Sequence, residues 1–482
     1  MLSASVAADD RAGRDTAAVQ VAVAAGHPAT ADAGLEILAE GGTAADAAVA
    51  ASLASCVAET VMTGIAGGGY ALWWDGEGAR LLDFFVSAPG LGKPKQDVQL
   101  VDIGVPFGDE LVHYRVGIAS CAVPGVPAGL HVLWQRHGRL PWERVVEPAL
   151  TLARRGVEMP PAHAACLAML APVMTMREGA RIYSPGGRLL EPGDRLEQPG
   201  LATMLELLRD EGGHSFYDGS LAEALLGLMS ERGGLVNRQD LADYQPEWAE
   251  PLSSDYLGNT VVSRGGITAS VGDKLAELPS LRDASPTERA LSLARVLVAR
   301  AYSGEGEPLG DTTNLVTADA VGNACVLTTS LGLGSGDYLP GLDVHLNSML
   351  GEVDLLVNPV VPGRRMESMM APTLVLAEGR PLLAAGAAGG TRLRPALVQV
   401  LAGILDEGLG PQEAVERGRL HSTGELVHAE PGFPEEALAA LEEQYDVRRW
   451  DAVHHYFGGV SLIAESGLAA DPRRSGAARA LP

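Results

Sequence analysis

The residues best suited to take part in a chemical reaction are two adjacent threonines, Thr312 and Thr313. They follow Gly310-Asp311 and begin a predicted strand. If the hydroxyl of Thr312 cuts the peptide bond before it, the residue gains a free α-amino group, whose ordinary pKa is about 7.7–8.0. That amine can accept the proton of the hydroxyl on the same residue. The pattern therefore indicates a self-activating nucleophile, although threonine also favours strand starts for structural reasons alone.

A pair of glycines, Gly389 and Gly390, lies where a second predicted strand ends and a helix begins. Backbone N–H groups at the start of a helix point outward, and the helix dipole favours negative charge there. Such groups stabilise the oxyanion that forms when a nucleophile attacks a carbonyl. The pair is therefore a candidate oxyanion hole, with a tight turn as the structural alternative.

Motifs of several other enzyme classes are absent from the sequence. It contains no G-x-x-x-x-G-K-[ST] phosphate loop and no G-x-S-x-G nucleophile elbow. His454 and His455 are adjacent, which is the wrong spacing for two metal ligands on one helix face, and no H-E-x-x-H occurs. The sequence therefore predicts neither a metal site nor an organic cofactor.

Short strands near both ends of the chain, with helices between them, must hold these candidate residues. Thr43 and Asp46 match a capping box, which predicts a helix over 44–58. Thr30 is a candidate cap for an earlier helix, which runs from there to Gly41-Gly42. The stretch 264–311 is poorly patterned and is predicted to be rich in loops. Strands are predicted at 19–24, 70–75, 80–86, 312–319 and 324–330 and in a hairpin over 372–385.

The composition excludes several kinds of partner. The chain has 482 residues, with 36 Lys+Arg against 61 Asp+Glu and a formal net charge of −25. This balance argues against sequence-independent nucleic-acid binding and against a basic membrane anchor. No run of about 18 apolar residues occurs, and the first residues lack the basic and apolar regions of a signal peptide. We therefore expect a cytoplasmic protein whose partner is a small-molecule substrate.

Several blocks, in a fixed order along the chain, together resemble the γ-glutamyltransferase family of N-terminal-nucleophile (Ntn) hydrolases. The resemblance covers about residues 19–480. The blocks include Gly26-His27-Pro28, Gly41-Gly42-Thr43-Ala44-Ala45-Asp46, Gly64-Ile65-Ala66-Gly67-Gly68-Gly69, Val123-Pro124-Gly125-Val126-Pro127, Asp311-Thr312-Thr313, Gly389-Gly390 and Asp471-Pro472-Arg473-Arg474. Each block is weak evidence alone, and their common order is the specific signal.

The resemblance implies an α+β fold, the four-layer αββα sandwich of Ntn hydrolases. It implies that the precursor cuts itself between Asp311 and Thr312 and that Thr312 is then the catalytic nucleophile. Ser330 aligns with the second hydroxyl of the family, which hydrogen-bonds that nucleophile. Gly389 and Gly390 align with the family's oxyanion-hole pair.

The resemblance also divides the chain into segments. Residues 1–18 are expected to be a flexible arm, 19–311 the large subunit and 312–482 the small subunit. The two fragments should stay together as one αβ unit, because neither alone completes the sandwich. The family's chemistry implies no metal and no organic cofactor.

The chain departs from the family where glutamate is recognised. The D-F-R-E block, whose arginine holds the glutamyl α-carboxylate, reads Asp83-Phe84-Phe85-Val86, and phenylalanine cannot form that bidentate pair. The block that binds the α-amino group is reduced to a single plausible anion, Glu352. The candidate substrate-binding residues are Phe85, Thr313, Gly332, Met349, Glu352, Ser368 and Met369.

Three hypotheses for the function follow. The first is a self-processing Ntn hydrolase that attacks a small, non-glutamyl biosynthetic intermediate and cleaves an amide or an activated C–C bond. In this it resembles the γ-glutamyltransferase-like proteins of actinobacterial antibiotic pathways (4-alkylproline, lincomycin and pyrrolobenzodiazepine). The second is a conventional γ-glutamyltransferase or glutathione hydrolase. The third is an inactive relative that serves as a binding protein and stays uncut.

Overall fold

The computed structural model describes residues 20–94, 98–107, 110–267, 270–298, 312–352, 355–356 and 358–482. The predicted arm, 1–18, lies outside the described residues, and so does Asp311, the residue before the predicted cleavage site.

Two β-sheets form the centre of the molecule. Within the described residues, the first sheet has the strand order β22-β1-β11-β12-β2-β3-β8 and the second has the order β21-β20-β16-β15-β10-β9. The strands of the first sheet are β1 (Ala22–Ala25), β2 (Gly68–Trp74), β3 (Ala79–Phe84), β8 (Glu247–Ala249), β11 (Thr313–Ala318), β12 (Ala324–Ser330) and β22 (Ala477–Ala480). Those of the second are β9 (Leu252–Tyr256), β10 (Asn259–Ser263), β15 (Thr373–Ala377), β16 (Arg380–Ala388), β20 (Gly459–Ala464) and β21 (Gly467–Ala470).

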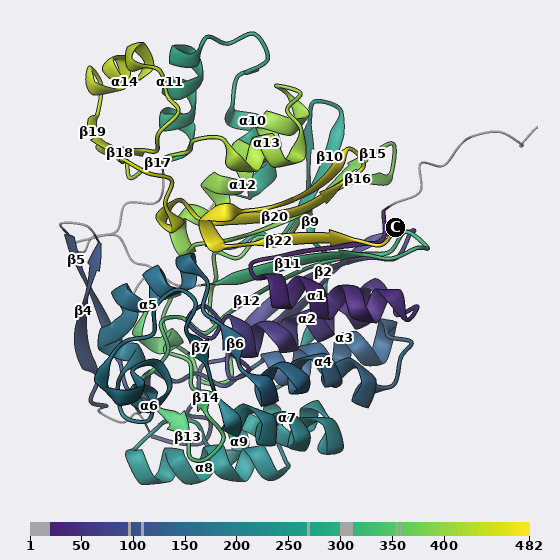
Figure 1. Cartoon of the computed structure of the whole chain (residues 1–482), viewed down its shortest axis with the longest axis vertical. Coiled ribbons are helices and arrows are strands. Elements are labelled where there is room, and N and C mark those ends of the chain that lie inside the picture. Colours follow the sequence, from purple (N-terminus) through teal and green to yellow (C-terminus); the bar gives the residue numbers. More distant parts are fainter. Residues whose placement is uncertain are drawn as a thin grey trace, which may run out of the picture.

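The two sheets face each other between two layers of helices, as Figure 1 shows. Strands β11 and β12 pack against β16 and β20 of the other sheet. Helices α1 (Pro28–Ala39) and α2 (Ala44–Ala58) cover the first sheet, while α10 (Val271–Glu277), α12 (Leu393–Leu405) and α13 (Pro411–Glu416) cover the second. The fold is therefore the predicted four-layer αββα sandwich of the α+β class.

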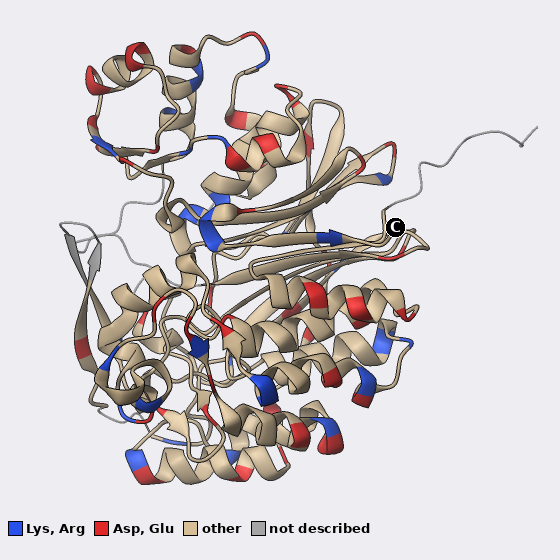
Figure 2. Cartoon of the chain, viewed as in Figure 1, with Lys and Arg blue, Asp and Glu red and all other residues tan. Residues whose placement is uncertain are grey.

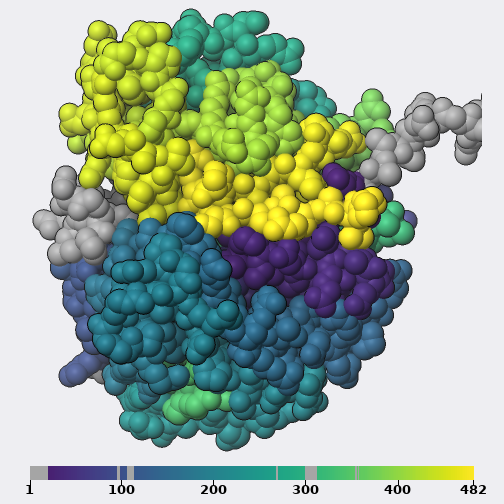
Figure 3. Space-filling model, viewed as in Figure 1, coloured from purple at the N-terminus to yellow at the C-terminus, as the bar shows by residue number. Residues whose placement is uncertain are grey.

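Pairing between distant segments builds the first sheet. β1 pairs with β11 on one side, where Ala22 lies opposite Ala318, and with β22 on the other, where Ala22 lies opposite Ala480. Figure 3 shows the N-terminal and C-terminal segments side by side across the middle of the molecule. Because β1 lies between two strands of the C-terminal part, this sheet exists only when both parts of the chain are present.

Strand β11 contributes to both hydrophobic cores. Leu315 packs in the core between the first sheet and the α1/α2 layer, whereas Val316 packs in the core between the two sheets. Successive side chains of a strand point to opposite faces. Thr313 therefore faces the α2 side with Leu315, while Thr312 faces the opposite side.

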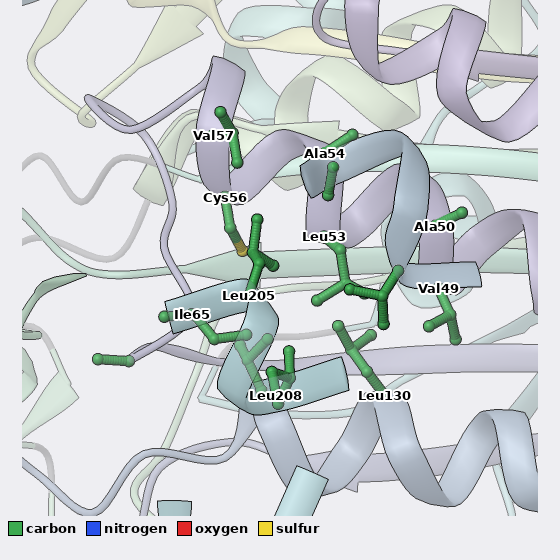
Figure 4. Packing of buried hydrophobic residues seen from close by; sticks show 14 of the residues in the cluster. Val49, Ala50, Leu53, Ala54, Cys56, Val57, Ile65, Leu130, Leu205 and Leu208 are labelled. Carbon is green, nitrogen blue, oxygen red and sulfur yellow. The ribbon is translucent and has the colours of Figure 1, made fainter. Parts of the chain in front are cut away.

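Helix α2 is buried along its whole length. Its first turn carries the predicted capping box, in which Thr43 accepts from the N–H of Asp46 and Asp46 accepts from the N–H of Thr43. Alanine dominates its sequence, and small side chains let neighbouring elements approach closely. Figure 4 shows its residues packed against Leu130 of α3 (Val126–His137) and against Leu205 and Leu208 of α7 (Pro199–Glu211).

Two predictions about helices were wrong. His27, rather than Thr30, caps α1, because Nδ1 of His27 accepts the N–H of Ala29 at 2.9 Å. The stretch 264–311 is not mainly loop in its described part, since it contains α10 and α11 (Pro286–Val296). Both of these helices start with a capping box, formed by Ser270 and Asp273 in α10 and by Ser285 and Glu288 in α11. Each capping serine is a local sequence signal for a helix start, which we overlooked because this stretch has no clear hydrophobic periodicity.

The remaining elements flank the sandwich. A helical lobe lies beyond α2 and contains α4 (Trp142–Arg155), α5 (Pro161–Met174), α6 (Gly179–Tyr183), α8 (Ser220–Arg232) and α9 (Arg238–Asp243). A smaller unit packs near α12 and contains β17 (Leu420–Ser422), β18 (Leu426–Ala429), α14 (Glu435–Glu442) and β19 (Asp446–Arg449). The hairpin of β4 (Val101–Phe107) and β5 (Glu110–Val116) lies at one side.

The charged residues are spread over this frame. Figure 2 shows Asp and Glu distributed over the outer helices with Lys and Arg among them, rather than gathered into one patch on the visible face. In the part of the chain that the structure describes, no helix has the length and apolarity needed to cross a bilayer.

Candidate active site

Thr312 lies directly before β11, in the interior of the first sheet, and the residue is 4% exposed. A cavity of about 30 Å³ opens beside it. The cavity is lined by Phe85, Thr312, Ser330, Met349, Glu352, Leu355, Ser368, Met369, Met370, Gly390 and Leu393. Most of the residues predicted for catalysis and substrate binding therefore meet at one place, although they come from segments far apart in the sequence.

Ser330 ends β12, the strand that neighbours β11. The register places Thr329 opposite Thr313, so Ser330 lies across from Thr312 at the same end of the sheet. The N–H of Gly332 donates to Oγ of Ser330 at 3.0 Å. This contact holds the hydroxyl at the cavity wall, next to the predicted nucleophile.

Glu352 is the charged member of the described cavity lining and is buried. Its Oε1 accepts the N–H of Leu333 at 3.0 Å and the hydroxyl of Ser348 at 3.4 Å. Gly332 does not line the cavity itself. It has φ +68°, and a Cβ atom there would lie 2.1 Å from Oε1 of Glu352, so glycine makes room for the carboxylate.

Phe85 forms an aromatic wall and is 1% exposed. It stacks on Tyr70 with ring centroids 5.7 Å apart, and the guanidinium of Arg264 lies 4.0 Å from the centroid of the Tyr70 ring. That guanidinium is behind the wall, because the described residues that line the cavity include no lysine, arginine or histidine. The described lining therefore presents no cation at Phe85, the position where the sequence resemblance led us to expect an arginine in place of phenylalanine.

Two arginines support the wall from outside. Nη1 of Arg264 donates to the carbonyl of Ser368 at 2.7 Å, and Nε of Arg394 donates to the carbonyl of Met369 at 3.1 Å. Burial, together with the neighbouring Arg264, lowers the pKa of Arg394 to about 10. Both arginines hold the segment that carries two predicted binding residues.

The glycine pair lies where predicted, at the end of β16. Gly389 and Gly390 have φ values of +127° and +56°, which favour glycine, and the chain then turns through Gly390–Arg392 into α12. Gly390 lines the cavity. Gly389 lies behind it, where a Cβ atom would come within 2.8 Å of Cα of Gly458.

Thr313 is not brought to this cavity. The pleat of β11 turns its side chain toward the end of α2, where its hydroxyl donates to Oε2 of Glu59 at 2.5 Å. The hydroxyl of Thr30 donates to the other oxygen, Oε1, at 2.6 Å. Thr313 therefore joins a hydrogen-bonded network on the far side of Thr312.

Glu59 is a residue that the sequence reasoning missed. It ends α2, is 0% exposed, and burial raises its pKa to about 7, although the hydroxyls of Thr30 and Thr313 and the charge of Arg474 oppose that rise. A second cavity of about 10 Å³ lies between Glu59 and Thr312 and is also lined by Arg474. The available signal was an acidic residue directly after an alanine-rich helix whose other charged residue, Asp46, belongs to its capping box.

The described residues offer no group of three His, Cys, Asp or Glu side chains that could hold a metal ion. The buried polar groups around Thr312 are hydroxyls, carboxylates, backbone amides, the carboxamide of Asn314 and the guanidinium of Arg474. Such an arrangement can perform nucleophilic attack on a carbonyl with a backbone-bound oxyanion.

The sequence pattern of the family described as Gamma-glutamyltranspeptidase matches residues 30–271 and 267–481. A relative named Acylase ACY 1 proenzyme, from Pseudomonas sp. (strain SE83), is 31% identical over 87% of this chain and 85% of its own. The Glutathione hydrolase proenzyme of Pseudomonas aeruginosa is 28% identical over 83% of this chain and 82% of its own.

Solved structures have the same fold. The cephalosporin acylase from Bacillus halodurans superposes with a TM-score of 0.79 over 100% of both chains, at 25% identity. A structure titled LmbA2991HD superposes with a TM-score of 0.77 over 96% of this chain and 98% of the other, at 21% identity. The second likeness concerns the fold alone.

Proposed function

This chain belongs to the gamma-glutamyltranspeptidase family of Ntn hydrolases, and we propose that it uses Thr312 to cleave the acyl group from a small substrate that is not a γ-glutamyl compound. The family and the enzyme class agree with the sequence motifs. The observation that carries the proposal is the cavity beside Thr312, whose described lining has an aromatic wall and no cation.

The first step of the proposed mechanism is self-processing. The hydroxyl of Thr312 attacks the carbonyl before it, and hydrolysis of the resulting ester leaves two fragments, 1–311 and 312–482, in one αβ unit. The relatives named proenzyme support this step. The pairing of β1 with both β11 and β22 supports the cohesion of the fragments, because a strand of the first fragment lies between two strands of the second.

The second step is acyl transfer. The new amine of Thr312 takes the proton of Oγ, which attacks the substrate carbonyl, and the N–H groups at Gly389 and Gly390 stabilise the oxyanion. Ser330 lies at the cavity wall, where its hydroxyl can hydrogen-bond the nucleophile. The amine then protonates the leaving group, and water hydrolyses the acyl ester.

The cavity lining suggests the nature of the acyl group. A glutamyl α-carboxylate placed against Phe85 would lose its hydration without gaining a partner, which costs several kcal/mol. Met349 and Met369 offer a flexible apolar surface, and Glu352 offers one anion for an amine. We therefore favour an acyl group that lacks a carboxylate and has an apolar body.

The bond that is cleaved is an amide in the preferred form of this proposal. The relatives named as acylases support that choice. An activated C–C bond is compatible with the same attack if the leaving carbanion is stabilised, and a biosynthetic intermediate of that kind is the second form. Conventional glutathione hydrolysis is the alternative suggested by the name of the 28% identical relative.

The test compares two chromogenic amides with purified protein. Release of p-nitroaniline from an uncharged acyl anilide, with slow or no release from γ-glutamyl-p-nitroanilide, is the expected result. Efficient turnover of the γ-glutamyl anilide would refute the substrate proposal. Intact mass should show fragments 1–311 and 312–482, whereas a protein that stays whole when correctly folded would favour an inactive binding protein.

A further inference from the structure

Glu59 is a buried carboxyl group that the proposed mechanism does not use. It is 0% exposed and lies at the end of an apolar helix, where an unpartnered charge would be costly. Two threonine hydroxyls satisfy it, one from α1 and one from β11: Thr30 at 2.6 Å and Thr313 at 2.5 Å. A carboxyl held in this way has a fixed position relative to the start of β11.

The carboxyl group lies close to the predicted nucleophile. Thr313 directly follows Thr312, and both residues line the small cavity that Glu59 faces. Its volume of about 10 Å³ is the space of roughly one water molecule. After cleavage of the bond before Thr312, the new amine begins the strand that Glu59 contacts.

A glycine permits this close approach. A Cβ atom at Gly26 would lie 2.7 Å from Oε2 of Glu59 and 2.9 Å from Oγ1 of Thr313. The φ value of Gly26 is not in the left-handed region, so space rather than conformation requires glycine there. The chain therefore keeps room for the contact between Glu59 and Thr313 by using the smallest residue.

We propose that Glu59 is a positioning residue that sets the protonation state of the Thr312 amine, through the Thr313 hydroxyl and a water in the small cavity. This inference rests on the proposed role of Thr312. A carboxylate near an ammonium stabilises the charged amine. The amine must be neutral to accept the Oγ proton. Ionised Glu59 therefore raises the pKa of the amine and with it the pH at which the nucleophile becomes active.

Other charged groups face Glu59 from the surrounding elements. Arg474, which follows β21, favours the ionised form of Glu59 and lines the same cavity. Asp471 also lines that cavity. The Cys56 thiol, one turn earlier in α2, has a pKa raised to about 12 by burial and by the charge of Glu59. Burial brings the pKa of Glu59 itself to about 7, close to neutral pH.

The test measures the amine directly and needs no substrate. Periodate cleaves the Cα–Cβ bond of an N-terminal threonine, giving a glyoxylyl end, acetaldehyde, ammonia and iodate, and the reaction requires the neutral amine. The mass of fragment 312–482 follows its rate against pH. In Glu59→Gln the apparent pKa of the amine should fall by ~0.5–1 unit relative to wild type.

Two further variants keep the inference testable if Glu59→Gln folds poorly. Thr313→Val and Thr30→Val each remove a hydroxyl that favours the ionised carboxylate, so each should lower the apparent pKa of the amine in the same direction. Asp46→Asn is the matched control, because Asp46 is a buried carboxyl at the other end of α2. It should lose stability but leave the amine titration unchanged.

The outcomes separate the two proposals. Uncut wild-type protein has no N-terminal threonine and no periodate reaction, which would overturn the proposed function. Protein that is cut and reacts, but titrates identically in wild type, Glu59→Gln and Thr313→Val, would overturn only the role of Glu59. An equal shift in Asp46→Asn would show a general effect of destabilisation and would also overturn that role.

Discussion

Replacing Gly332 by alanine should displace Glu352 from the cavity wall. The new Cβ would lie 2.1 Å from Oε1 of Glu352 and 2.7 Å from Oγ of Ser348, and both contacts are far inside van der Waals distance. The carboxylate must move, so the buried N–H of Leu333 loses one of its two acceptors, and the other, Oγ of Ser348, is crowded by the same Cβ. The substitution therefore acts on a predicted substrate-binding residue through its neighbour.

The loss of stability in Gly332→Ala has two parts, and the same substitution at a second glycine measures one of them alone. Alanine in the left-handed region costs about 1–2 kcal/mol by itself. Gly322 has φ +90° and nothing within 4 Å of its Cβ position, so Gly322→Ala should show that cost alone. Gly332→Ala should lose a further ~1–3 kcal/mol, because the buried hydrogen bond from the N–H of Leu333 to Glu352 is broken and the one to Ser348 is strained.

Urea unfolding of both variants measures the difference, and turnover of an uncharged acyl anilide measures the effect on the site. We expect Gly332→Ala to be the less stable variant and to lose at least ~10-fold in kcat/KM, which corresponds to about 1.4 kcal/mol. Gly322→Ala should retain wild-type kcat/KM. Equal stability and equal kcat/KM in the two variants would refute the inferred contact between Gly332 and Glu352.

Three further predictions concern processing and stability. Thr312→Ala should remain one uncut chain without activity, which intact mass and the anilide assay check. Burial lowers the pKa of His27 to about 4, so between pH 4 and 6.5 the unfolded state binds more protons than the folded state. About 3 kcal/mol of the free energy of unfolding should therefore be lost as the pH falls from 6.5 to 4. Urea midpoints measured against pH check this. Glu430→Gln should cost roughly 3–5 kcal/mol, because Arg473, 0% exposed in its side chain, would keep only Asp471, which already pairs with Arg419, and one buried positive charge would be left uncompensated. An unchanged urea midpoint would contradict this.

Local signals in the sequence predicted much of the frame. The capping box at Thr43 and Asp46 fixed the start of α2, and two β-type runs on either side of a turn at Val321-Gly322-Asn323 marked β11 and β12. These features depend on residues within a few positions of one another. The same reasoning failed for α1, because Thr30 offered a plausible cap while the ring of His27 took that place.

The sequence by itself determined the family, because its motifs stand in a fixed order along the chain, and through that resemblance it predicted the layered fold and the positions that depart from the glutamate-binding pattern. Only the tertiary structure decided which side of Thr312 each of these residues occupies. It turned Thr313 toward Glu59, put Arg264 behind the wall of Phe85, and closed the cavity around groups distant in sequence. The physical reason is that side-chain direction follows from strand pleat and from packing between the two sheets, and both arise only when remote segments pair.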